Sequence, residues 1–240
     1  FFIAVAATNL FHQGNWQRVY AAKNNDVLKK SLIFSFIIIL PIVFLRGFSG
    51  LIAVSQNETL IPDLAFFSLI LKENGIQLSI IIIILAISLT VSSIDTLINA
   101  VSSLIIVDGN KVFKGRKDYL KFSKQIIIIL SIIAFVVASK GLSILYLFLL
   151  ADLFCCAFVL TVFYSFYDKN INEKTAYVSI IIGLIGGFLM FPSPDFSKSL
   201  LVGILMPKEF FGPFVAQSLL FLSFVVATFL PLVVFKAKKF

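Results

Sequence analysis

The chain has 240 residues, of which 60% are apolar, 15% aromatic and only 13% charged, and its mean hydropathy is +1.05. A soluble domain carries about a quarter of its residues charged, so this composition excludes a water-soluble globular protein and indicates an all-α, polytopic bundle of membrane helices. The net charge of +8 does not indicate a nucleic-acid partner, because the 20 basic residues lie between the apolar runs.

Seven apolar segments follow one another along the chain, the first of them truncated, and a helix needs about 20 such residues to cross a bilayer. They are 1–11, 31–54, 76–107, 125–138, 142–167, 176–191 and 215–235. The third is longer than a bilayer requires and is expected to tilt or to leave the membrane at one end. The chain opens inside the first segment without an initiating methionine, so it is expected to be a fragment of a longer protein.

The basic residues indicate an orientation. If all seven segments cross the membrane, most of the basic residues fall on one side, in the loops 12–30, 108–124 and 168–175 and at the C-terminus. The positive-inside rule then places the C-terminus of this multi-pass cell-membrane protein in the cytoplasm. The outer loop 55–75 contains an apolar run, 61–71, that is too short to span and is expected to form a helix at the outer surface.

Polar residues recur every three or four positions along the long third segment. They are Ser88, Ser92, Thr96, Asn99 and Ser103, with Ser93 and Asp95 beside them. This spacing places them on one face of a helix. Small hydroxyl residues also let membrane helices pack closely, but the Ser92-Ser93 pair with the Asp95 carboxylate favours a cavity or an ion site. Hydroxyl and carbonyl oxygens suit a hard, singly charged cation such as Na⁺.

Two further places in the apolar segments carry polar groups. The stretch 8–18 is too polar for a lipid-facing helix end, so its backbone is expected to be broken or unwound. Asp152 is a second intramembrane carboxylate without an evident partner; it belongs either to a functional site or to a hydrated outer vestibule. Cys155 and Cys156 are adjacent and His12 is the only histidine, so spaced metal ligands are not available.

Two of these motifs resemble the sodium:solute symporter family. The sequence 11–23, FHQGNWQRVYAAK, resembles the signature after the broken sixth core helix, and 91–108 resembles the eighth core helix. The resemblance implies the LeuT-like inverted-repeat fold of five plus five helices. Residues 1–167 would supply core helices six to ten and 168–240 two peripheral spans, while the N-terminal half with the first repeat is missing.

The resemblance also implies site residues. Sodium would be held by the Ser92 and Ser93 hydroxyls and the Leu89 carbonyl, together with carbonyls of the missing first helix. Asp95 would tune cation affinity or serve a second ion. The substrate-lining region of the broken sixth helix maps onto Val5, Thr8 and Asn9. The sugar-transporting branch carries a lysine in the span corresponding to 31–54, and this span has none; amino acids, urea, polyols and organic acids remain open.

The sequence therefore predicts sodium-coupled symport of a small polar solute by alternating access, with Na⁺ as the coupling ion. The alternative is a transporter-like membrane sensor that feeds a cytoplasmic signalling module. An enzyme is not predicted, because the chain shows no Ser/His/Asp set, no metal-ligand spacing and no phosphate-binding glycine loop.

Overall fold

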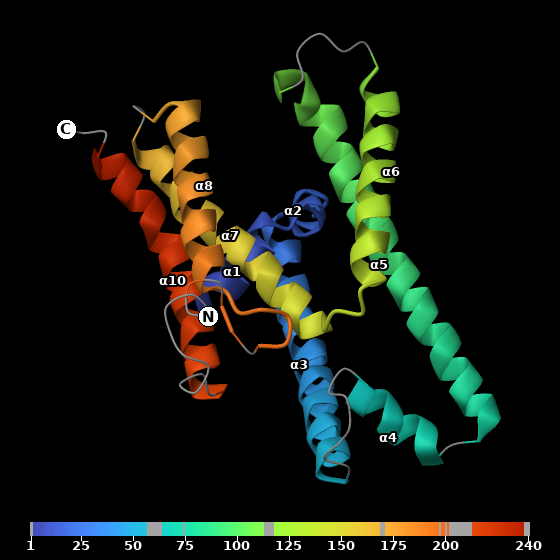
Figure 1. The fold of residues 1–240 in the computed structure, drawn as a ribbon. Helices are drawn as coiled ribbons and strands as arrows, with labels where there is room; N and C mark the ends of the chain where they lie inside the picture. Colours follow the sequence, from blue (N-terminus) through green and yellow to red (C-terminus); the bar gives the residue numbers. More distant parts are fainter. Residues whose placement is uncertain are drawn as a thin grey trace. The chain divides into compact units, whose positions relative to one another are not determined.

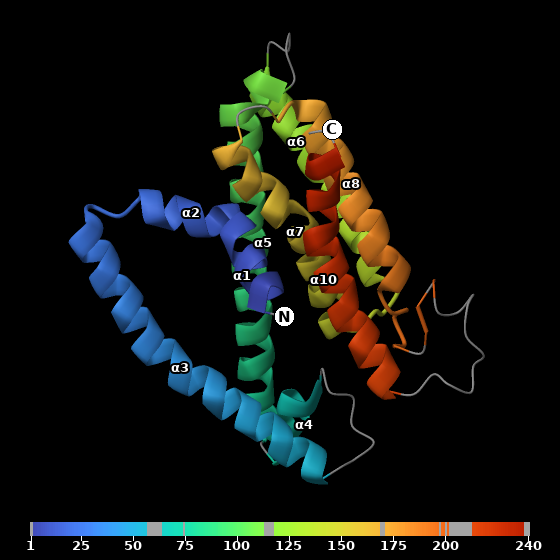
Figure 2. The same ribbon diagram turned by 90° about the vertical axis from the view of Figure 1, so that its left-hand side faces the viewer.

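The computed structural model describes residues 2–56, 64–73, 75–112, 118–168, 171–196, 198–199, 201 and 213–237, which are almost entirely helical. The helices are α1 (Phe2–Phe11), α2 (Gln13–Tyr20), α3 (Asn25–Gln56), α4 (Ala65–Glu73), α5 (Ile76–Val112), α6 (Tyr119–Ala138), α7 (Ile144–Tyr167), α8 (Glu173–Met190) and α10 (Pro213–Ala237) (Figure 1, Figure 2). Extended pairing in these ranges is limited to an isolated antiparallel bridge between Pro192 and Ser199. The fold is an all-α bundle, as predicted.

Six of the described helices, α3, α5, α6, α7, α8 and α10, are long and apolar enough to cross a bilayer. They coincide with the last six of the seven predicted segments, and α1, with 10 residues, corresponds to the truncated first segment. The chain is therefore a multi-pass membrane protein. Helix α5 has 37 residues. At 1.5 Å per residue such a helix is about 56 Å long, well beyond a hydrocarbon core of about 30 Å, so α5 must tilt or extend out of the membrane.

Helices α6 and α8 begin before the apolar segments predicted for them, because polar caps rather than hydropathy set their first residues. Helix α6 begins at Tyr119, where the Asp118 side chain accepts a hydrogen bond of 3.0 Å from the Lys121 backbone N–H. Helix α8 begins after Asn172, whose side chain accepts from the Thr175 N–H at 2.9 Å. Each cap satisfies a backbone donor that the first helical turn leaves without a partner.

The helix predicted over 61–71 is found as α4, although 61–63 lie outside the described residues. It packs against α3. The guanidinium of Arg46 on α3 lies 4.7 Å from the centroid of the Phe66 ring on α4, a cation–π contact. The position of α4 at the outer surface stays a prediction.

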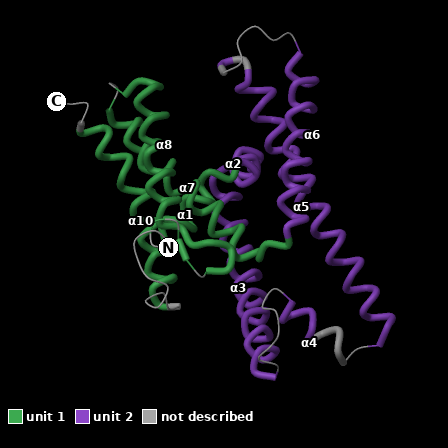
Figure 3. The backbone as a smooth tube through the Cα atoms, viewed as in Figure 1, with its two compact units in different colours: residues 1–12, 141–240 green, residues 13–140 purple. Residues whose placement is uncertain are grey.

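The chain divides into two compact units, residues 1–12 with 141–240 (unit 1) and residues 13–140 (unit 2) (Figure 3). Both junctions coincide with interruptions of the helical backbone. The first is His12, which separates α1 from α2 and confirms the predicted break. The second is the turn before α7, where Gly141 has a φ of +63° that other residues rarely adopt.

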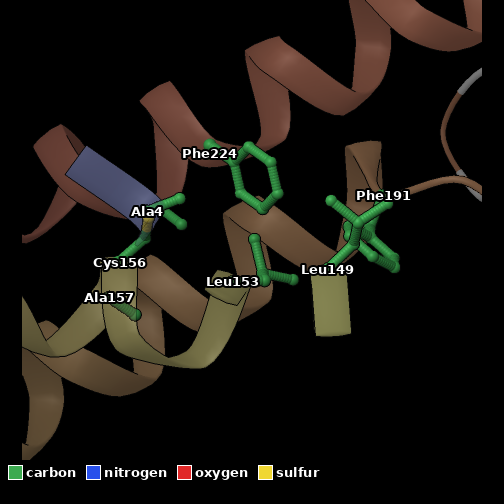
Figure 4. Close-up of a cluster of buried hydrophobic side chains, with 8 residues drawn as sticks. Ala4, Leu149, Leu153, Cys156, Ala157, Phe191 and Phe224 are labelled. Carbon is green, nitrogen blue, oxygen red and sulfur yellow. The ribbon is translucent and has the colours of Figure 1, made fainter. Parts of the chain in front are cut away.

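Unit 1 packs α1, α7, α8 and α10 around one buried cluster. Its members are Ala4, Leu149, Leu153, Cys156, Ala157, Phe191, Phe224 and Ala227. Figure 4 shows Ala4 of α1 and Phe224 of α10 directed towards α7. The α7–α8 contact adds a buried hydrogen bond of 3.1 Å between the hydroxyls of Thr161 and Ser179. Close packing of small residues and hydrogen bonds between helices are the interactions that stabilise bundles in lipid.

Candidate ion and solute sites

The predicted polar stripe lies along one continuous helix, α5. Its hydroxyls bond to their own helix: Ser93 Oγ donates to the Leu89 carbonyl at 2.9 Å and Thr96 Oγ1 to the Ser92 carbonyl at 3.0 Å. Hydroxyl side chains within membrane helices commonly satisfy themselves in this way. The helix and its stripe are confirmed, while a lining role for the stripe stays a prediction.

The three residues predicted to hold sodium lie within one turn of α5. Leu89, Ser92 and Ser93 are all exposed in unit 2. The Ser93 hydroxyl oxygen and the Leu89 carbonyl oxygen are 2.9 Å apart, close enough to contact one cation together. A hydroxyl that donates its proton keeps lone pairs for a cation. The local geometry is therefore compatible with a sodium ligand set.

Asp95 forms a polar pair one turn along the same helix. Its Oδ2 accepts a hydrogen bond of 3.3 Å from the Asn99 side-chain amide, and both residues are exposed in unit 2. The only ion pair within the described ranges joins Lys111 and Asp108 at 3.1 Å, near the end of α5. The charge of Asp95 is thus moderated by an amide and not by a described basic side chain.

The C-terminal end of the stripe serves helix packing. Ser103 accepts a hydrogen bond of 2.6 Å from the Gln17 amide of α2, and Ser102 accepts one of 2.9 Å from the Ser123 hydroxyl of α6. This is the close-packing role that small hydroxyl residues often have in membranes. The stripe therefore divides into an exposed part around Ser92 and a packed part around Ser103.

Asp152 of α7 has a partner that the sequence left open. It is buried, with 8% of its surface exposed, and its Oδ1 accepts a hydrogen bond from the hydroxyl of Thr8 on α1. Two predicted site residues 144 positions apart thus meet inside unit 1. A carboxylate at the centre of a membrane helix costs about 2.5–3.5 kcal/mol on insertion scales. The buried position of Asp152 therefore requires a structural or functional reason.

The other predicted solute residues lie on a face of α1 that adjoins the buried one. Ala4 and Ala7 are buried, whereas Val5 is 41% exposed and Asn9 is exposed. The Asn9 side-chain amide donates to the Val5 carbonyl at 3.0 Å. Helix α1 therefore presents one face to the packed interior and another, with Val5 and Asn9, away from it.

Two features were not predicted from the sequence. An aromatic group of Tyr146, Phe191 and Phe196, with ring centroids 5.6 and 6.0 Å from that of Tyr146, adjoins a cavity of about 200 Å³. A larger apolar groove of about 400 Å³ lies between α5 and α6. Their residues come from separate segments, and no local pattern brings such segments together.

Most of the chain is similar to a known transporter. It is 28% identical over 172 residues to the spermidine transporter of Candida albicans, a match that covers 70% of this chain and 32% of that protein. The chain spans about a third of the length of this relative. No protein-family profile and no solved structure matches it. The similarity is to a transporter, and the six membrane-length helices agree with a multi-pass membrane protein.

Proposed function

We propose that the protein is a sodium-coupled symporter, which moves a small polar solute across the cell membrane by alternating access. The observation that carries the proposal is the grouping of two adjacent hydroxyls, Ser92 and Ser93, with the Leu89 carbonyl on one turn of a membrane helix. Similarity to a transporter supports it.

The proposed mechanism uses the LeuT-like fold. Residues 1–167 form core helices six to ten, and 168–240 form two peripheral spans. The break between α1 and α2 at His12 supports this assignment, because discontinuous helices hold substrate and ions near the midplane of such transporters. Sodium bound at Ser92 and Ser93 favours one arrangement of the two repeats and raises solute affinity, and the solute raises sodium affinity by the same factor.

The solute is a small polar molecule, and the relative's name puts a polyamine among the first solutes to test. Amino acids, urea, polyols and organic acids complete the panel. The absence of lysine from 31–54 argues against a sugar.

Uptake into vesicles that contain the full-length protein tests the coupling. With an inward sodium gradient, we expect uptake of one solute class to fall by about tenfold or more when K⁺ or choline replaces Na⁺, as a coupling free energy of 1–3 kcal/mol allows. Protein-free vesicles and a sodium ionophore are the controls. Uptake that is indifferent to sodium would remove the ion assignment and leave a transporter of another mechanism.

The proposed orientation has the C-terminus in the cytoplasm, which gives a labelling prediction. A membrane-impermeant maleimide should label Lys140→Cys, in the turn before α7, on intact cells. Lys174→Cys, on the first turn of α8, should react only after permeabilisation. Both positions are exposed, and the unsubstituted protein measures the background from Cys155 and Cys156. The reverse pattern would invert the topology.

A further inference from the structure

Asp152 is a buried carboxylate within a membrane-length helix. Only 8% of its surface is exposed, and α7 packs against α1, α8 and α10. A carboxylate in such surroundings cannot be fully hydrated and must bind a proton, a cation or several hydrogen-bond donors. The described residues provide one donor, the Thr8 hydroxyl.

The basic side chains that the structure describes in unit 1 form no ion pair with this carboxylate. Lys198 borders the cavity beside Tyr146, which precedes Asp152 by about 9 Å along the axis of α7. Lys236 follows the Phe235 ring that stacks on Tyr164, about 18 Å beyond Asp152 along the axis. Within the described part of the chain no ion pair includes Asp152. The described residues therefore leave Asp152 without a cation, which a bound solute can supply.

The Thr8 hydroxyl positions one carboxylate oxygen. Its single proton has two acceptors in reach, the Ala4 carbonyl at 3.0 Å and Oδ1 of Asp152. An ionised carboxylate attracts this proton more strongly than a carbonyl does. In the described residues, His12 Nδ1 is the only side-chain polar atom that is buried without a partner. Oδ2 of Asp152 receives no hydrogen bond from the described residues.

The donor set fits an ammonium group better than a metal ion. A hard metal ion takes about six oxygen ligands, whereas Asp152 and Thr8 offer one carboxylate and one hydroxyl. An ammonium group needs few acceptors and gains a charge-assisted hydrogen bond from a single carboxylate. The neighbouring face of α1, with Val5 and Asn9 exposed, suits the methylene groups that an alkylamine carries.

We propose that Asp152 binds the protonated amino group of an alkylamine solute and that Thr8 is a positioning residue for its carboxylate. The proposal rests on the transport function proposed above and names the chemical class of the solute and the residue that selects it. A neutral molecule of the same shape leaves the carboxylate without its cation and is rejected.

Equilibrium binding to the full-length protein in nanodiscs tests the selection. The probes are putrescine and 1,4-butanediol, which share a four-carbon chain and differ in charge. The wild type should bind putrescine and discriminate against the diol. Asp152→Asn should weaken putrescine binding by about thirtyfold or more, as expected when one partner of a buried charged pair is removed. The asparagine keeps an oxygen for Thr8, so the fold should persist, and Asp26→Asn on the exposed start of α3 is the matched control.

Thr8 is tested through rescue. Thr8→Val should weaken putrescine binding several-fold, and Thr8→Ser should restore it. If Thr8 had a purely structural role, Thr8→Val would not change the preference for putrescine over 1,4-butanediol. Unchanged putrescine affinity in Asp152→Asn would overturn the proposal, as would equal binding of amine and diol by the wild type. A changed pH dependence of uptake with unchanged amine affinity would assign Asp152 to a proton, also against the proposal. Sodium-indifferent transport of amines would remove only the symport mechanism.

Discussion

Replacing Gly187 by leucine is expected to force α8 away from α10 and to lower the melting temperature of the full-length protein by roughly 5–10 °C. A Cβ atom at Gly187 would lie 2.9 Å from the Ala227 Cβ and 2.9 Å from the Leu153 Cδ1. Ala227 Cβ is fixed to the backbone of α10, so it can move only if the helix moves. Overpacking of this kind costs about 1–3 kcal/mol and exceeds the gain of up to about 1 kcal/mol in helix propensity.

Gly47 on α3 offers the matched control for Gly187→Leu, because a Cβ at that glycine meets nothing within 4 Å. Gly47→Leu should therefore melt at or slightly above the wild-type temperature. Gly183→Leu should behave like Gly187→Leu, since a Cβ there would lie 2.9 Å from the Ala227 carbonyl oxygen. Heating detergent-solubilised protein and measuring the monodisperse fraction gives the comparison. Indistinguishable melting of Gly187→Leu and Gly47→Leu would show that α8 and α10 are not in close contact.

This packing also bears on the proposed amine site. The Leu153 side chain that meets Gly187 follows Asp152 directly in α7. A bulkier residue at position 187 would displace this turn of α7 and with it the Asp152 carboxylate. We therefore expect the glycine variants that still fold to lose amine affinity together with stability.

The membrane spans were predictable from the sequence because hydrophobic length is a local property. Each predicted span has its helix, and the break near His12 was indicated by polar residues that lipid would not tolerate. The helix ends were less predictable. Lys121 and Lys124 lie within α6, although their charge excludes them from an apolar window, because the Asp118 cap and not the membrane sets the start of that helix.

Contacts between helices were not predictable in the same way. Thr8 and Asp152 were each recognised as polar residues in apolar segments, but periodicity along one helix contains no information about which face of another it meets. The spacing of Ser179, Gly183 and Gly187, four residues apart on α8, was a usable signal that the sequence analysis missed. It is the small-residue pattern that brings membrane helices close together.

The second large effect is a loss of sodium affinity, which we expect from Ser92→Ala and from Ser93→Ala in the full-length protein. Each change removes one hydroxyl ligand from a cation, and a hydrogen-bond-like contact to a charged group contributes about 1.5–3 kcal/mol. The sodium concentration for half-maximal uptake should therefore rise by about tenfold or more in each variant. Alanine favours the helix and both sites are exposed in unit 2, so folding should be unaffected.

Ser49→Ala on α3, whose hydroxyl donates to the Arg46 carbonyl at 2.8 Å, removes the same group away from the proposed site and should leave sodium activation unchanged. Ser93→Thr keeps a hydroxyl and should recover most of the sodium affinity. Linkage supplies a second criterion, because loss of bound sodium should raise the solute KM at low sodium and leave it near wild type at saturating sodium. If both alanine variants keep wild-type sodium activation, the ion is bound elsewhere and not by the hydroxyls of Ser92 and Ser93.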